Sequence, residues 1–153
     1  MPKMMCFDMD GTIADLYAVP DWLPKLRAED PTPYRDAPPM WDMEALRNVL
    51  LALTAQGWEI RVVSWLSKGA SREYKRAVRA AKREWLARYN FPADKVHLIA
   101  YGATKANAVR SANPSPAILI DDTEKVRNGW TLGEALDPLE IEDLPAYLES
   151  YLE

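Results

Sequence analysis

Two aspartates stand one residue apart, directly after an apolar run near the start of the chain. The segment "MMCFDMDGT" places Asp8 and Asp10 behind residues 4–7, and Gly11 and Thr12 follow them. Carboxylates gathered at the end of a buried strand repel one another unless a positive charge lies among them. A calcium-binding loop would need glycine at its sixth position, whereas Gly11 is the fourth residue counted from Asp8. The pattern therefore favours a site for a cation or a phosphate over an ordinary acidic turn.

Three further polar features stand at the ends of elements along the chain. The second apolar run ends in Ser64, the fourth ends in Asp121-Asp122, and Lys105 begins a predicted helix after the third. Ligands of open parallel sheets bind at the carboxyl edge of the strands, so these side chains are expected at one place. Several carboxylates together need a cation, and a small cluster of hard oxygen ligands suits Mg²⁺ with substrate phosphate oxygens.

Apolar runs and helical patterns alternate along the chain, which is typical of βαβ units around a parallel sheet. Strands are expected at 4–7, 59–64, 95–100 and 117–122, with a short fifth within 133–139. Helices are expected at 41–57, 71–89, 104–112 and 141–153. The many Lys and Arg residues of the 71–89 helix indicate a solvated face. The prediction is an α/β, Rossmann-like, three-layer fold with a mostly parallel sheet, as a single domain over 1–153.

Residues 16–40 do not fit the alternation, because they are rich in proline and carry several aromatic side chains. So long an insertion between a strand and its helix is often functional. Its aromatic residues are Tyr17, Trp22 and Tyr34, with Trp41 at its end. Aromatic faces can stack a nucleobase or pack the insertion onto the body, and both readings stay open. Arg27 and Arg35 are candidates for a second anionic group of a substrate or for plain surface charges.

Composition limits the classes of function. The chain has 153 residues, 48% of them apolar, and a net charge of −4, which argues against wrapping a nucleic-acid backbone. The single cysteine, Cys6, excludes an internal disulfide and is expected to be an inert buried thiol in a reducing compartment. We expect no signal peptide, no membrane span and a cytoplasmic location. The single histidine, His97, lies in an apolar run and is expected to be a strand residue rather than a catalyst.

Together these motifs resemble the haloacid dehalogenase (HAD) superfamily of phosphatases. That family has an apolar strand with D-x-D-G-T, a strand ending in Ser or Thr, a lysine before the fourth strand, and a strand ending in two acids. This chain shows "FDMDGT", "IRVVS", "YGATK" and "AILIDD", so the likeness extends from residue 4 to about 130. Its stretches "AILIDDTEKVRNGW" and "YGATK" are most similar to small bacterial and phage proteins of the 5′(3′)-deoxyribonucleotidase type. The resemblance implies a HAD-type fold with a very small cap insertion at about 16–40.

The resemblance also implies catalytic roles. Asp8 would be the nucleophile that forms an aspartyl phosphate, and Asp10 would protonate the leaving alkoxide and then activate water. Ser64 would donate a hydrogen bond to a phosphoryl oxygen. Lys105 would neutralise the phosphate as a point charge, with Lys68 as its rival.

The same resemblance implies a magnesium site. Mg²⁺ would lie between Asp8, the backbone carbonyl of Asp10, and Asp121 and Asp122. Asp122 is expected to be the direct ligand, with Asp121 orienting water or the lysine.

Four residues near this set have other expected roles. Gly11 would let the backbone turn close to the metal, and Thr12 would donate to phosphate. Trp65 departs from the many relatives that carry a small residue after the serine, and it either shapes the substrate pocket or belongs to the core. Asp15 lies past the turn and is expected to have no catalytic role.

The leading functional prediction is a Mg²⁺-dependent phosphomonoesterase that acts on a small phosphorylated substrate, with a nucleoside monophosphate foremost. Sugar phosphates or other small metabolites are the alternative substrates. A non-catalytic phosphate-binding or partner-binding module is the alternative of another class. The net negative charge disfavours nucleic acid as a partner. A second subunit that covers the site is a remaining alternative.

Overall fold

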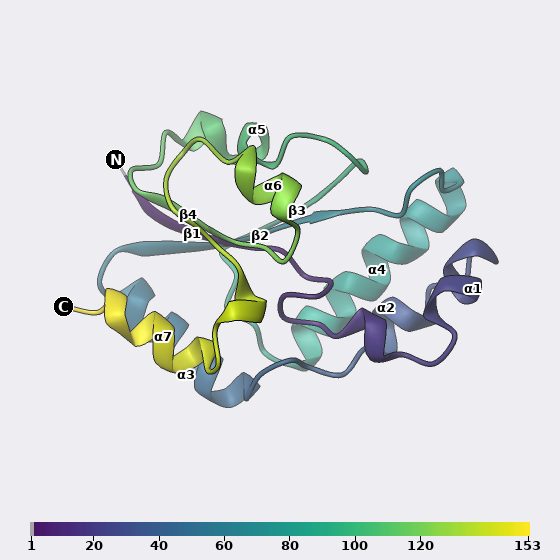
Figure 1. Ribbon diagram of the computed structural model, residues 1–153, viewed down its shortest axis with the longest axis horizontal. Helices are drawn as coiled ribbons and strands as arrows, with labels where there is room; N and C mark the ends of the chain where they lie inside the picture. Colours follow the sequence, from purple (N-terminus) through teal and green to yellow (C-terminus); the bar gives the residue numbers. More distant parts are fainter. Residues whose placement is uncertain (1) are drawn as a thin grey trace.

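One parallel sheet of five strands organises the molecule (Figure 1). The computed structural model describes residues 2–153. The strands are β1 (Lys3–Phe7), β2 (Trp58–Trp65), β3 (Lys95–Ile99), β4 (Ala117–Ile120) and β5 (Ala135–Leu136). They lie in the order β3-β2-β1-β4-β5, and every neighbouring pair is parallel. This confirms the predicted α/β architecture, which is a HAD-like Rossmann fold.

Helices cover both faces of the sheet and give three layers, with α5 and α6 on one side and α3 and α7 on the other (Figure 1). The α-helices are α1 (Trp22–Arg27), α2 (Thr32–Asp36), α3 (Met43–Ala55), α4 (Arg72–Arg88), α5 (Lys105–Val109), α6 (Glu124–Asn128) and α7 (Leu144–Leu148). Short 3-10 turns are η1 (Leu16–Ala18), η2 (Arg110–Ala112), η3 (Pro138–Glu140) and η4 (Glu149–Tyr151). Within residues 2–153, no helix combines the length and the apolar character needed to cross a membrane.

The alternation of side chains along β1 divides the core between the two faces. Met5 and Phe7 belong to the larger cluster, which α3, α4 and α7 cover. Met4 and Cys6 belong to the smaller cluster under α5. Burial raises the pKa of the Cys6 thiol to about 12, which agrees with the expected inert thiol.

Side-chain caps explain where the two long helices begin. The Asp42 carboxylate accepts from the backbone N–H of Ala45 (3.0 Å), and the Ser71 hydroxyl accepts from that of Tyr74 (3.1 Å). Both helices therefore begin within two residues of their predicted positions. The closing helix is shorter than the predicted 141–153: α7 covers Leu144–Leu148, with Pro145 in its first turn, and the 3-10 turn η4 follows it.

The insertion at 16–40 forms η1, α1 and α2, none of which the sequence pattern predicted. It lies beside α4 at one end of the molecule (Figure 1). The Arg88 guanidinium donates to the carbonyl of Arg35 (2.8 Å), and the Tyr74 hydroxyl donates to that of Asp30 (2.9 Å). These contacts fasten the insertion to α4, which positions it over the carboxyl edge of the sheet.

Candidate active site

Three aspartates meet where β1 and β4 end. Asp8 follows β1 and Asp121-Asp122 follow β4, and one oxygen from each lies within 4.8 Å of the others. The pairing of Phe7 with Ile120 sets this register, so the residues that follow are neighbours. The strand order reverses between these two strands, which is where ligands bind in open α/β sheets.

Lys105, the first residue of α5, lies among these acids. Its Nζ is 2.9 Å from Asp8 Oδ1 and 2.7 Å from Asp121 Oδ2. Burial disfavours the ammonium, yet the two carboxylates raise the pKa of Lys105. Lys68, the rival from the sequence, is exposed and lies 5.8 Å from the centre of the Tyr101 ring. The structure thus places Lys105, and not Lys68, against Asp8.

The turn after β1 contacts both Asp8 and Asp122. The Thr12 hydroxyl donates to Asp8 Oδ2 (3.1 Å) and accepts from the backbone N–H of Asp122 (3.2 Å). Gly11 has φ of +80°, and a Cβ there would lie 2.2 Å from Asp122 Oδ2. Only glycine combines this backbone conformation with so close an approach.

A second buried lysine reaches the site from α4, and it is an exception to the predicted solvated face of this helix. Lys82 is fully buried, and its Nζ donates to Asp10 Oδ2 (2.9 Å), Ser64 Oγ (2.7 Å) and the carbonyl of Trp65 (2.8 Å). The sequence held a signal for this, because Lys82 stands four residues after buried Val78, on the apolar stripe of the helix.

The charges of the site do not balance by themselves. Asp8, Asp10, Asp121 and Asp122 face Lys82 and Lys105, so two negative charges are in excess when all four carboxylates are ionised. Burial and the proximity of Asp8 raise the pKa of Asp121 to about 6 and that of Asp122 to about 8. Burial also raises the pKa of Asp10, and Lys82 opposes this rise. A divalent cation would remove the excess, and a set of carboxylate oxygens fits Mg²⁺.

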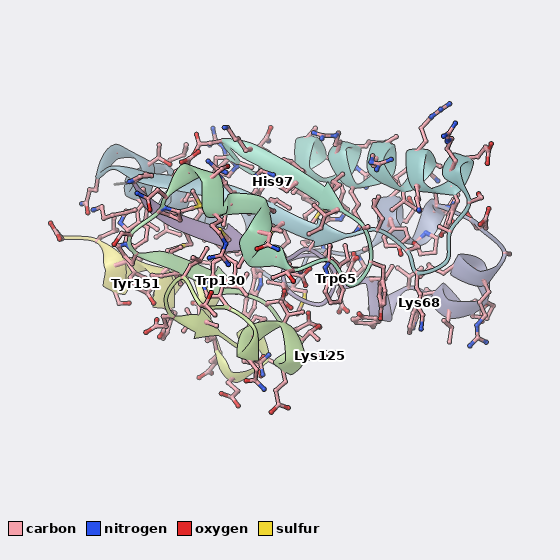
Figure 2. The ribbon with its side chains drawn as sticks, turned by 90° about the horizontal axis from the view of Figure 1, so that it is seen from above. Trp65, Lys68, His97, Lys125, Trp130 and Tyr151 are labelled. Atoms are coloured by element: carbon pink, nitrogen blue, oxygen red, sulfur yellow. The ribbon has the colours of Figure 1, made fainter. Side chains whose placement is uncertain are left out.

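A cavity of about 460 Å³ opens over the acids, with Asp8, Asp10 and Ser64 in its lining. The insertion contributes Tyr17 and Trp22, whose rings meet edge to face with centroids 4.9 Å apart. Trp65 and Lys68 also line the cavity, and Figure 2 shows Lys68 beyond Trp65, toward the end of the molecule where the insertion lies.

Trp65 belongs to the wall of this cavity and is half-buried. Its Nε1 donates to the carbonyl of Ala103 (2.8 Å), and its ring lies 5.0 Å from that of Tyr101. The Lys105 Nζ is 5.3 Å from the centre of the Trp65 ring, close enough for a cation–π contact. Of the two readings from the sequence, the structure favours the pocket.

The remaining candidates from the insertion differ in where they lie. Arg27 lines the cavity, whereas Arg35 forms an exposed ion pair with Asp36 (3.1 Å). The Trp41 Nε1 donates to the carbonyl of Thr12 (2.7 Å) and so holds the turn in place.

The single histidine takes no part in the site. His97 lies on β3, set apart from Trp65 and Lys68 (Figure 2), and its Nε2 is 3.3 Å from an Arg61 nitrogen.

The sheet order and the acids at its switch point define a protein of the HAD-like fold class. Its fold matches D,D-heptose 1,7-bisphosphate phosphatase from Burkholderia thailandensis with a TM-score of 0.56 and 11% identity over 97% of both chains. It also matches a chain of the Pnkp1/Rnl/Hen1 RNA repair complex, with a TM-score of 0.58 and 15% identity over 90% of this chain and 42% of that one. No protein-family model and no curated protein matches the chain in sequence. The similarity of this chain to these known proteins is therefore a similarity of fold alone.

Proposed function

We propose that the protein is a Mg²⁺-dependent phosphomonoesterase that forms an aspartyl phosphate on Asp8. The observation that carries the proposal is the contact of Lys105 with Asp8 inside a cluster of three buried or half-buried aspartates at the switch point of the sheet. The fold shared with a known bisphosphate phosphatase supports the reaction class.

In the first step, an Asp8 oxygen attacks phosphorus, the new oxygen–phosphorus bond forms and the ester bond breaks. Lys105 neutralises charge on the transferring phosphoryl group, and Ser64 donates to one of its oxygens. Asp10 gives a proton to the departing oxygen. In the second step Asp10 takes a proton from water, which attacks the aspartyl phosphate and releases inorganic phosphate and Asp8.

Asp8, the backbone carbonyl of Asp10, and Asp122 would hold the cation. The Asp121 carboxylate pairs with the Lys105 ammonium (2.7 Å) and accepts from the backbone N–H of Thr123 (2.9 Å), whereas the Asp122 carboxylate lies 3.4 Å from the Thr12 hydroxyl. This favours Asp122 as the direct ligand and Asp121 as the group that orients Lys105. Bound Mg²⁺ would withdraw electron density from the phosphoryl group and offset its negative charge.

A nucleoside monophosphate is the leading substrate. The cavity has aromatic side chains on two walls, Tyr17 and Trp22 from the insertion and Trp65 from β2. A planar base can stack on such faces, and its size is compatible with a cavity of about 460 Å³.

Sugar phosphates form the second candidate class. Two exposed cations, Arg27 and Lys68, line the same cavity, and they would suit a second anionic group on the substrate. The fold match to a sugar bisphosphate phosphatase agrees with this choice.

A panel of phosphomonoesters, assayed with Mg²⁺ and with excess chelator, tests the proposal. We expect inorganic phosphate release that depends on Mg²⁺, with nucleoside monophosphates turned over faster than sugar phosphates. Equal and negligible release under both conditions would exclude the enzyme. Mg²⁺ binding in calorimetry without turnover of any ester would instead favour a non-catalytic phosphate-binding module.

A further inference from the structure

We propose that Lys82 is a positioning residue that holds the Asp10 carboxylate and the Ser64 hydroxyl in their reactive orientations. The inference rests on the proposed phosphatase function, in which Asp10 transfers the proton. It concerns a residue of α4, an element to which neither the motifs nor the fold likeness assigns a role.

The contacts of Lys82 fix its ammonium group completely. A lysine has three N–H donors, and here each has its own acceptor: Asp10 (2.9 Å), Ser64 (2.7 Å) and the carbonyl of Trp65 (2.8 Å). The side chain is 0% exposed, and the ring of Tyr34 covers it at 5.0 Å from Nζ to the ring centre. The side chain is therefore closed to bulk solvent, and its three hydrogen bonds hold the ammonium group in one position.

The bond to Ser64 has a directional consequence. An ammonium group can only donate, so Ser64 Oγ is the acceptor in this contact. The Ser64 proton is then free to point to another acceptor, and Ser64 lines the cavity over the acids. Lys82 thus orients the hydroxyl as a donor to a phosphoryl oxygen.

The bond to Asp10 places the proposed acid and base. Asp10 lies on the turn after β1, where its side chain is 18% exposed, and Lys82 is its partner in the ion pair. General acid catalysis needs the proton within hydrogen-bond reach of the departing oxygen, so a displaced carboxylate loses this contribution. A merely structural ion pair would affect folding without affecting which esters react.

The dependence of kcat/KM on the leaving group distinguishes a positioning role of Lys82 from a merely structural one. An alkyl phosphate needs its departing oxygen protonated, whereas p-nitrophenyl phosphate releases a stable anion without a proton. In the Lys82→Met variant we expect the ratio of kcat/KM for the alkyl ester to kcat/KM for the aryl ester to fall by at least about tenfold. Because kcat/KM covers only steps up to the departure of the alcohol, later hydrolysis does not influence the ratio.

Two single variants and one double variant serve as controls for this effect. Ser64→Ala should lower both rates alike and leave the ratio unchanged, since Ser64 contacts the phosphoryl group and not the leaving group. Arg83→Met removes an exposed cation one residue along the same helix and should change neither rate. In an Asp10→Asn background, Lys82→Met should leave the ratio within about threefold, since the group that it positions is gone.

A folded Lys82→Met protein that keeps the wild-type ratio within about threefold would overturn the proposal. If circular dichroism shows that this variant is unfolded, Lys82→Arg keeps the buried charge and decides by the same ratio. Its longer, planar guanidinium cannot place a nitrogen at the Nζ position without displacing Asp10, so the ratio should again fall. A wild-type protein without phosphatase activity would refute the proposed function instead, which is a distinct result.

Discussion

Asp8 is held by two donors, Lys105 on one oxygen at 2.9 Å and Thr12 on the other at 3.1 Å. Replacement by asparagine keeps the shape and removes the nucleophilic oxygen. We expect Asp8→Asn to lose turnover to the limit of detection while circular dichroism and the melting temperature stay close to wild type. Asp15→Asn, which changes an acid outside the cluster, should keep full activity. Retained turnover in the Asp8 variant would exclude Asp8 as the nucleophile.

Gly11 and Gly69 allow a matched test of the turn. Both have positive φ, +80° and +65°, but a Cβ at Gly69 would meet no atom within 4 Å, whereas one at Gly11 would overlap Asp122. Gly69→Ala should therefore cost only the backbone strain, about 1 kcal/mol in the free energy of unfolding. Gly11→Ala should cost more and should weaken Mg²⁺ binding at least about tenfold, because Asp122 must move. Calorimetry with Mg²⁺ on both variants measures the difference, and equal affinities would contradict the ligand role of Asp122.

At the scale of elements, the insertion supplies one wall of the cavity through Trp22 and Tyr17. Trp22→Ala should raise KM for a nucleoside monophosphate about tenfold, because an aromatic face against a base contributes about 1–3 kcal/mol. KM for glycerol phosphate, which has no base, should change less than about twofold. Tyr147→Ala, an exposed aromatic residue of α7, serves as the control. An equal rise in KM for both esters would argue against base stacking on this wall.

The elements that sequence predicted best are those with strong periodicity. The strands before Asp8 and Asp121 are continuous apolar runs, and α3 and α4 begin at the caps Asp42 and Ser71. Parallel pairing then requires the strand ends to meet, so the sequence was sufficient to predict that the acids gather. The helices of the 16–40 insertion were missed because α1 and α2 have only six and five residues and include proline. Helices so short depend on tertiary contacts, here with α4, rather than on their own propensity.

Lys82 shows the limit of reading a helix by its average character. The 71–89 segment is rich in Lys and Arg, and most of these side chains are solvated as predicted. The composition of the whole segment does not reveal that one lysine points inward. Its position on the apolar stripe, between Val78 and Trp85, does indicate this. The sequence could suggest that Lys82 faces inward, but not that Asp10 and Ser64 would be its acceptors. That pairing depends on how α4 packs against β2 and the turn after β1.

At the scale of the whole molecule, the fold concentrates negative charge at its switch point, and this should make stability depend on pH and Mg²⁺ together. The pKa of Asp121 is raised from 3.8 to about 6 and that of Asp122 from 3.8 to about 8, by burial and by Asp8. From about pH 4 to about pH 8, the folded protein therefore binds more protons at these two groups than the unfolded chain does. Without a cation, its stability should therefore fall as the pH rises from about 4 to about 8.

Asp122→Asn isolates this contribution, because asparagine never acquires the charge. In excess chelator, the unfolding free energy of the variant minus that of wild type should increase between about pH 5 and pH 8, since only wild type gains an unfavourable charge. In saturating Mg²⁺ the trend should reverse, because the ionised cluster binds the cation and binding stabilises the folded state. Urea denaturation at the two pH values, with and without Mg²⁺, gives the four differences needed. A difference that is independent of pH in chelator would contradict the charge excess at the switch point, and one that Mg²⁺ does not reverse would contradict Asp122 as a ligand.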